Sequence, residues 1–217
     1  MKLVIQLLLW IVIIFLGYMV FNAVYEPIQF NKVKEKRYAK VIDRLKDIRA
    51  AQLAHQEITG NFEKDFDKLI RFIDTAEYTL TQRRDSTVMD EEYRKAFGVD
   101  KYKDIIVVDT LGTASVKDSL FGKDDRYKKM MIVPIDGIDA KFTMDAGTIV
   151  KNDNKIPVFE AKVAKKVLLH DQDKDLVMTE NQVVSVEGVN GAFITVGSME
   201  DIKTEGNWPR AYDDQQQ

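Results

Sequence analysis

The 217-residue sequence contains no cysteine and only two histidines, His55 and His170. The lack of cysteine excludes disulfide bonds, thiolate catalysis and cysteine-based metal sites, and it fits a bacterial envelope protein as well as a cytosolic one. Two histidines are too few for a histidine-rich metal site. The sequence also lacks a Gly-x-Ser-x-Gly elbow, a Gly-x-Gly-x-x-Gly motif and a phosphate-binding loop. We therefore predict a protein that is not an enzyme and that binds no cofactor.

An excess of charge of one sign is also missing. The formal net charge is −3 at pH 7, and acids locally match the lysines and arginines, which argues against a nucleic-acid partner. The densest acidic segment is residues 170–175, His-Asp-Gln-Asp-Lys-Asp. Its alternating acids suggest a calcium loop of the EF-hand kind, but that template requires Gly and Glu where this chain has Leu176 and Gln182. We predict a solvated turn between strands and no metal site.

One feature is present in abundance: residues 3–24 form an apolar run without a single charge. At about 1.5 Å per residue this run makes a helix of roughly 33 Å, enough to cross a hydrocarbon core about 30 Å thick. The alternative is a cleaved secretory signal, whose apolar region has roughly 7–15 residues and precedes a small-residue cleavage site. Here the run is longer and ends in Tyr25-Glu26-Pro27. We predict an uncleaved single-pass anchor over residues 1–27.

A short break at Glu26-Pro27 separates the anchor from a second predicted helix, over residues 33–59. Its apolar residues recur every three or four positions and share one face: Tyr38, Val41, Ile42, Leu45, Ile48, Ala51, Ala54 and Ile58. A shorter helix over residues 65–74 can fold back on this stalk, so that it or a sheet covers half of the stripe. The other half is predicted to bind a partner helix through Tyr38, Val41, Leu45 and Ile48.

Five basic residues lie just beyond the apolar run: Lys32, Lys34, Lys36, Arg37 and Lys40. Near anionic headgroups each contributes about 1 kcal/mol to membrane binding. The alternative is that they form the solvated face of a helix that must leave the membrane. Both interpretations place this segment beside the bilayer, and membrane lipid is its predicted partner.

Composition divides the rest of the chain into four parts. A stalk unit with its return helix spans residues 28–77, and a polar, weakly patterned connector spans 78–103. An antiparallel β domain follows over 104–205, and a flexible tail over 206–217. The predicted fold class is α+β: a transmembrane helix is continued by an amphipathic stalk helix and followed by a small antiparallel sheet domain.

Within the β domain, short apolar or alternating segments predict strands at 105–108, 114–120 and 159–169. Two further hairpins are predicted around Asp136-Gly137 and Asn190-Gly191, because these dipeptides are typical of two-residue hairpin turns. Strand 159–169 follows a predicted turn at Asn152-Asp153-Asn154. The total is a sheet of six or seven strands.

Residues 48–62, Ile-Arg-Ala-Ala-Gln-Leu-Ala-His-Gln-Glu-Ile-Thr-Gly-Asn-Phe, together with Asp67-Lys68-Leu69, resemble the end of the long N-terminal helix in type IV pilins and pseudopilins. This resemblance implies a membrane helix continuous with a stalk, with a sheet packed at its far end. The region extending to residues 109–110 and 116–122 is also similar to uncharacterised bacterial single-pass membrane proteins with an extracytoplasmic α+β domain.

Two features of pilins are missing from this chain. There is no Gly-Phe-Thr-Leu-Ile-Glu processing site before the apolar run, and Gln6 is the nearest polar group where pilins carry an acid. A polymerising pilin is therefore not expected.

The basic residues and the length of the domain favour opposite orientations of the anchor. The basic residues after the apolar run outnumber the two positive charges before it, which by the positive-inside rule favours a cytoplasmic domain. Long domains, however, translocate largely regardless of charge, and the pilin resemblance implies translocation. We predict a bacterial inner-membrane protein with its domain in the periplasm.

The predicted function is that of a non-enzymatic structural or interaction subunit of an envelope complex, such as a pilus-like, secretion or motility assembly. Its predicted partners are other membrane proteins of that complex, and a second copy of the chain is a further candidate. The alternative is an accessory subunit of a membrane translocase or enzyme complex with a cytoplasmic domain. An envelope hydrolase is a third hypothesis, and it requires a pocket that unites carboxylates from distant strands.

Overall fold

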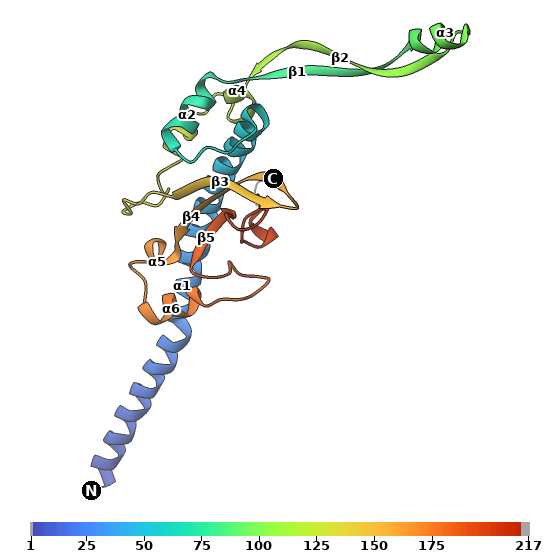
Figure 1. Ribbon diagram of the computed structural model, residues 1–217. Coiled ribbons are helices and arrows are strands. Elements are labelled where there is room, and N and C mark those ends of the chain that lie inside the picture. Colours follow the sequence, from blue (N-terminus) through green and yellow to red (C-terminus); the bar gives the residue numbers. More distant parts are fainter. Residues whose placement is uncertain (1, 214–217) are drawn as a thin grey trace.

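The computed structural model describes residues 2–213, apart from the side chain of Asn22. The chain is an α+β protein in which one long N-terminal helix carries two small antiparallel sheets and several short helices (Figure 1). The helices are α1 (Lys2–Thr59), α2 (Phe66–Thr75), α3 (Glu91–Phe97), α4 (Val116–Leu120), α5 (Lys165–Leu168) and α6 (Lys174–Asn181), with 3-10 turns η1 (Arg126–Lys129) and η2 (Arg210–Tyr212). The strands are β1 (Glu77–Met89), β2 (Tyr102–Ser115), β3 (Thr143–Lys151), β4 (Asn154–Ala164) and β5 (Phe193–Gly197).

Helix α1 is continuous through Pro27, so the predicted break at Glu26-Pro27 is wrong. A proline inside a helix removes one backbone hydrogen bond and costs roughly 3 kcal/mol. Here helix is favoured on both sides, because an apolar segment precedes Pro27 and Phe30 is already buried in the core. The result is one helix of 58 residues, about 87 Å long.

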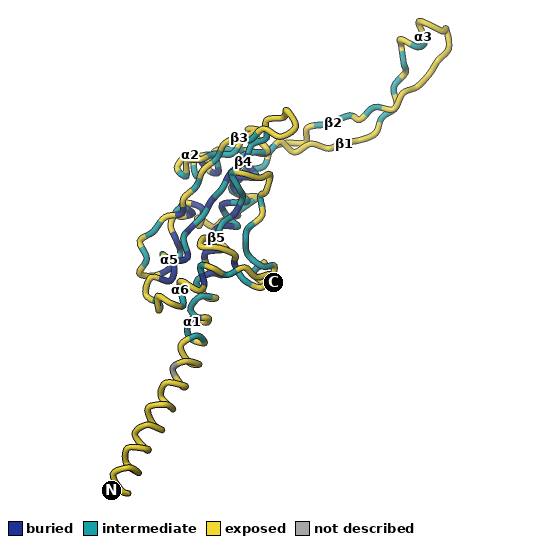
Figure 2. The backbone as a smooth tube through the Cα atoms, turned by 60° about the horizontal axis from the view of Figure 1, so that its bottom comes forward, coloured by how far each residue is buried: buried dark blue, intermediate teal, exposed yellow. Residues whose placement is uncertain are grey.

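The N-terminal part of α1 is long and apolar enough to span a membrane. Its most apolar window of 18 residues has a mean hydropathy of 2.7, and none of that window is buried. Residues 3–21 and 23–24 are exposed, and Figure 2 shows this part of the helix extending away from the folded body. It is therefore a candidate membrane-spanning segment, and the folded body begins about 9 Å beyond it, at Phe30.

The core lies along the rest of α1, where β4 and β5 pack against the helix. Every second residue of β4 is buried from Phe159 through Ala161 to Val163, because successive side chains of a strand point to opposite faces. Strand β5 ends at Gly197, whose φ is +76° and where a Cβ would lie 2.2 Å from the carbonyl oxygen of Phe159. Only glycine fits this close approach of β5 to β4.

The predicted return helix over 65–74 is confirmed as α2. Asp65 caps it by accepting hydrogen bonds from the backbone N–H groups of Asp67 and Lys68. The buried amide of Gln52 on α1 holds the preceding turn, since its Oε1 accepts from the backbone N–H of Glu63 at 3.0 Å. Leu69 and Ile73 of α2 are then buried in the shared core.

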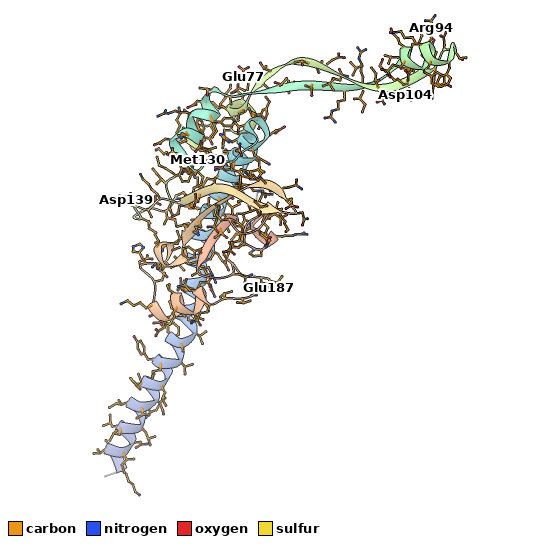
Figure 3. All side chains as sticks on the ribbon, viewed as in Figure 1. Glu77, Arg94, Asp104, Met130, Asp139 and Glu187 are labelled. Atoms are coloured by element: carbon orange, nitrogen blue, oxygen red, sulfur yellow. The ribbon has the colours of Figure 1, made fainter. Side chains whose placement is uncertain are left out.

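The region predicted as a connector, residues 78–103, instead forms most of a long hairpin. Strands β1 and β2 pair antiparallel from Glu77–Ser115 to Met89–Tyr102, and α3 closes the far end. We call this hairpin, residues 77–115, the arm. It leaves the body at the end of α1 opposite the N-terminus (Figure 1), and Figure 3 places Glu77 at its root, Asp104 along it and Arg94 at its tip.

The β domain contains fewer strands than predicted. Of the five strands that the described residues form, in the sheets β1-β2 and β3-β4-β5, only β2 to β5 fall in this domain, four instead of six or seven. The β3–β4 hairpin turns at Asn152 and Asp153, both with positive φ, as predicted. Residues 116–120, however, form α4, and residues 165–168 form α5.

Both predicted glycine hairpins are also wrong. Around Asp136-Gly137 the ladder is reduced to one bridge, Ile132 to Lys141, and residues 182–188 form a loop rather than a strand. Apolar side chains that were assigned to strands, such as Met130 and Phe142, pack in the core from irregular backbone.

Part of the predicted flexible tail is packed on the body. Gly206 bridges to Val196 at the edge of β5, and Lys46 of α1 donates to the carbonyl oxygen of Tyr212 at 2.6 Å. The indole N–H of Trp208 donates to Asp213 at 3.1 Å. Residues 214–217 of that tail lie outside the described residues, and the division of the chain into domains stays a prediction.

Candidate functional site

The stalk face predicted to bind a partner is covered by the chain itself. Tyr38 is 1% exposed, and Val41, Leu45 and Ile48 are fully buried. The sheet and the segments around it cover the stripe from Tyr38 to Ala54, although the prediction assigned them only half of it. These four side chains are therefore core residues and form no open surface for a partner.

The predicted basic segment divides into two groups. Lys34 and Arg37 are bound to acids of the body: the Nζ of Lys34 lies 3.0 Å from Glu180, and an Nη of Arg37 lies 2.7 Å from Asp171. Arg37 also donates to the carbonyl oxygen of Leu168 at 2.6 Å. Both side chains thus fix α1 to the body.

The remaining three basic residues are exposed. Lys32, Lys36 and Lys40 follow one another at intervals of four along α1 and so lie near one face of the helix. Of the five predicted membrane-surface residues, these three are available to a headgroup.

The contact between Arg37 and Asp171 is bidentate, with both carboxylate oxygens accepting from the guanidinium. The hydrogen bond from Arg37 holds the pKa of Asp171 well below its usual range. Such a two-bond pair is stronger and more directional than a single contact between charges. It ties the loop before α6 to the part of α1 nearest the apolar segment.

Replacing Asp171 with Asn is expected to lower the free energy of unfolding at neutral pH by about 1 kcal/mol, a small value because the carboxylate is partly exposed and screened. The pKa of Asp171 is lower in the folded than in the unfolded chain. Its contribution is therefore present above the unfolded pKa, near 4, and is lost as the pH falls through the folded pKa.

Urea unfolding of the natural chain and of Asp171→Asn at about pH 7 and pH 3 should show that their difference in free energy of unfolding shrinks in acid. Asp139→Asn, at an exposed acid, is the control. A difference that does not change with pH would contradict the prediction.

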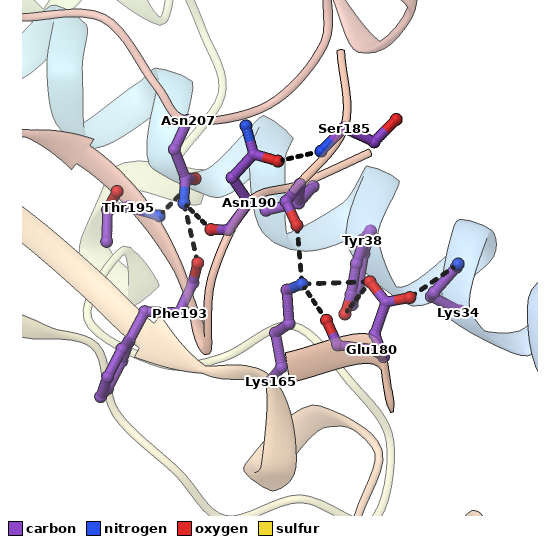
Figure 4. Close-up of polar contacts among 10 residues, drawn as sticks. Lys34, Tyr38, Lys165, Glu180, Ser185, Asn190, Phe193, Thr195 and Asn207 are labelled. Atoms are coloured by element: carbon purple, nitrogen blue, oxygen red, sulfur yellow. Dashed lines mark hydrogen bonds and ion pairs between the residues drawn. The ribbon is translucent and has the colours of Figure 1, made fainter. Parts of the chain in front are cut away.

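A buried ionic cluster joins α1 to the body beside these contacts (Figure 4). Lys165, the first residue of α5, has a fully buried side chain, and its Nζ donates to Oε1 of Glu180 at 3.1 Å. The same ammonium donates to the carbonyl oxygens of Glu180 at 2.8 Å and Val189 at 2.7 Å. Glu180 also accepts from the hydroxyl of Tyr38 at 3.3 Å and from Lys34.

Burial dominates the electrostatics of this cluster. Burial lowers the pKa of the Lys165 ammonium, and the hydrogen bond to Glu180 opposes that change. Burial also raises the pKa of the Tyr38 hydroxyl, and the nearby carboxylate of Glu180 raises it further. A carboxylate between two ammonium groups is well compensated inside a protein.

A cleft of about 240 Å³ lies beside the cluster, lined by Lys34, Tyr38 and Glu180 among others. Lys165 uses all three of its donors on protein acceptors. Its geometry therefore suits a structural pin, since a nucleophilic amine needs a free lone pair directed at a substrate. The pin joins α1, the start of α5, α6 and the loop at residues 182–190.

The other candidate polar residues have local structural partners. His55 Nδ1 lies 2.6 Å from the carbonyl oxygen of Asn61, and its ring packs edge-on against Phe72 with centroids 4.6 Å apart. Asp173 caps α6 by accepting from the backbone N–H groups of Asp175 and Leu176. The acidic segment therefore begins a helix, whereas a turn between strands was predicted. Across residues 2–213, no group of three or more His, Asp and Glu side chains is arranged to hold a metal ion.

The arm extends from the body and exposes several large apolar side chains. On one face of β2, Tyr102, Ile106 and Val108 are 62%, 65% and 54% exposed. Near its tip Phe97 and Val99 are 67% and 61% exposed. Within the described chain neither strand has a second neighbour. A two-stranded ribbon is at best marginally stable alone in water, so the arm is a candidate interaction element.

The chain matches no protein-family model, no curated protein and no solved structure. The resemblance to pilins therefore stays a prediction that depends on residues 48–69.

Sequence reasoning missed both the arm and the buried cluster. The run Ile-Ile-Val-Val at residues 105–108 did indicate a strand, and Asp90 and Gly98 are a matching N-cap and C-terminal glycine for α3. A helix bounded by caps and followed by a β-branched strand was thus a readable signal for the tip of the arm. Lys165 and Glu180 carry no comparable signal, because their partner Lys34 is more than a hundred residues away.

Proposed function

We propose that this chain is a non-enzymatic, single-pass structural subunit of a bacterial envelope complex, anchored in the inner membrane with its body in the periplasm. One observation carries the proposal: a single unbroken helix, α1, runs from the apolar segment to the root of the arm. An anchor and an exposed binding element joined in this way hold a partner at a set height above a membrane.

The contacts between α1 and the body support this role. Arg37 with Asp171, Lys34 with Glu180 and the buried Lys165 fix the body to the helix immediately beyond the apolar segment. The exposed Lys32, Lys36 and Lys40 lie within about 12–24 Å of the end of the apolar run. Where they reach anionic headgroups, each adds about 1 kcal/mol to the association with the membrane.

An accessory subunit with a cytoplasmic body is the second candidate function. The observation that favours it is the same set of exposed lysines directly after the apolar segment, since the positive-inside rule keeps such residues in the cytoplasm.

An alkaline phosphatase fusion after Gln217 separates the two candidates. We expect an active fusion that remains in the membrane fraction, because this phosphatase is active only after export. A silent fusion, together with activity of a cytoplasmic reporter at the same site, would support the second candidate. A mature chain in the soluble fraction would contradict both.

Membership of a complex is tested separately. The full-length chain, extracted from membranes in a mild detergent, is expected to co-purify with other membrane proteins. Its migration without any of them, after extraction under several gentle conditions, would contradict the proposed function.

A further inference from the structure

We propose that the arm binds the arm of a second copy of this chain, with the two β2 strands pairing antiparallel at their free edges about a two-fold axis at Ile106. This inference rests on the proposed function, since it takes both copies to be anchored in one membrane. It names the partner of the arm and the register of the contact.

The edge of β2 that faces away from β1 is unusually apolar for an edge with no strand beside it. Residues 105–108 are four consecutive β-branched residues, Ile-Ile-Val-Val, in the middle of the strand. Long exposed edges with such residues pair with other strands unless charges, proline or a bulge protect them. The irregularity in this ladder lies nearer the root of the arm, between Leu80 and Thr81, and leaves residues 102–110 regular.

The charges that flank this apolar run match those of a second copy. An antiparallel pair centred on Ile106 sets Ile106 opposite itself, Ile105 opposite Val107, and Lys103 opposite Asp109. Moving the axis to Ile105 sets Lys103 opposite Val107, and moving it to Val107 sets Asp109 opposite Ile105. Of these registers, the one at Ile106 pairs Ile105 with Val107 and a cation, Lys103, with an anion, Asp109, on each side, and it sets Asp104 opposite Val108.

The two charged residues can take part in this contact. The side chains of Lys103 and Asp109 are 53% and 44% exposed. Their partners within the arm are the partly buried Asp90 at 3.9 Å and the exposed Arg84 at 2.8 Å. Such surface pairs bind weakly and are readily shared with a third charge.

The same register accounts for the apolar residues at the two ends of the arm. Because residues 102–110 of the two copies pair with one another, the segment before residue 102 of one copy lies close to the segment beyond residue 110 of the other. The tip of one arm, with Phe97 and Val99, therefore lies beside the root of the other, where Leu111 is 67% exposed. Three exposed apolar residues per copy then lie within the contact.

A shared membrane gives two copies a suitable orientation. Two chains with their apolar segments in one bilayer are related by a two-fold axis along the membrane normal. Their arms leave the bodies at the same height, and two arms related by this axis run in opposite directions side by side. Antiparallel pairing of identical strands requires these opposite directions, and the proposal further takes the face of the ribbon at Ile106 to lie parallel to the membrane.

Cysteine cross-linking tests the register directly, because the natural chain has no cysteine. In isolated membranes treated with a mild oxidant, Ile106→Cys is expected to give a disulfide-linked dimer. Val150→Cys, at a side chain 68% exposed on the edge strand β3, is the matched control and is expected to stay monomeric. No dimer at position 106, equal dimer at both positions, or an adduct with a different protein at position 106 would each overturn the proposal.

Charged variants at the axis provide a second measurement. Copies with Ile106→Lys, or copies with Ile106→Glu, face a like charge and should associate roughly fivefold less than the natural chain. When differently tagged Ile106→Lys and Ile106→Glu chains are expressed together, the two variants should associate with each other more than either associates with itself. Because Ile106 is exposed in the single chain, neither change should disturb its fold, which circular dichroism checks. Equal association of all combinations would overturn the proposal.

These experiments distinguish failure of the arm contact from failure of the proposed function. A chain that co-purifies with other membrane proteins but gives no dimer through position 106 would retain the envelope role and lose the arm contact. A chain that forms the dimer but extracts without any other membrane protein would retain the arm contact and lose the envelope role.

Discussion

Replacing Lys165 with Met is expected to lower the free energy of unfolding of the full-length chain by about 3–5 kcal/mol, the usual cost of removing one partner of a buried ion pair. The ammonium of Lys165 is fully buried and donates to three acceptors, two of them backbone carbonyl oxygens. Methionine fills a similar volume but donates nothing, so those carbonyl oxygens lose their hydrogen bonds. Glu180 keeps Lys34 and Tyr38, which sets a limit to the loss. Urea unfolding in detergent measures the change.

The neighbouring residue supplies the control for this prediction. Lys166 is exposed, and Lys166→Met should change stability by less than about 0.5 kcal/mol. Equal effects of the two substitutions would show that Lys165 is not the buried pin described above. A loss at Lys165 that is reversed by additionally replacing Glu180 would identify the uncompensated charge as its cause.

Replacing Leu45 with Ala is expected to lower the free energy of unfolding of the isolated chain by about 2–5 kcal/mol. Leu45 is fully buried between α1 and the rest of the body, so the substitution removes apolar contacts and leaves a cavity. A partner-binding stalk predicts something different: Leu45→Ala would then weaken association with other proteins and leave the isolated chain unchanged. Urea unfolding of the purified chain separates these outcomes.

Ile58→Ala is the matched control, since Ile58 lies on the same helix and is 41% exposed. Its substitution should cost well under half as much as that of Leu45, because less apolar area returns to water. Comparable losses at the two positions would contradict the assignment of Leu45 to the core.

Features that depend on local burial could be predicted from the sequence. The apolar run, the α2 helix and the turn at residues 152–154 were all visible, because each follows from the spacing of apolar residues or from turn chemistry within a few positions. The stripe on α1 was also visible. What covers it was not, because α1 packs against β4 and β5, which lie more than a hundred positions beyond Leu45.

The arm was missed for a different physical reason. Strand β1 is exposed on both faces for most of its length, so it has no alternation of apolar and polar residues. Periodicity reports burial on one side, and a ribbon with two wet faces does not produce it. The hairpins predicted at Asp136-Gly137 and Asn190-Gly191 failed for another reason: the turn residues were correct indicators of a reversal, but the flanking segments do not pair with each other as a ladder. Residues 182–188 form a loop in which Val184 and Val186 are exposed, and β5 pairs with β4 instead.

The unbroken passage of α1 through Pro27 has a mechanical consequence. With the apolar segment in a bilayer, there is no hinge between lipid and body, and α1 acts as a lever with its pivot in the membrane. The root of the arm lies about 50 Å beyond the end of the apolar run, so a change in tilt of about 10° shifts it sideways by roughly 9 Å. Bilayer thickness, which sets the tilt of such helices, is thereby coupled to the spacing of whatever the arms hold.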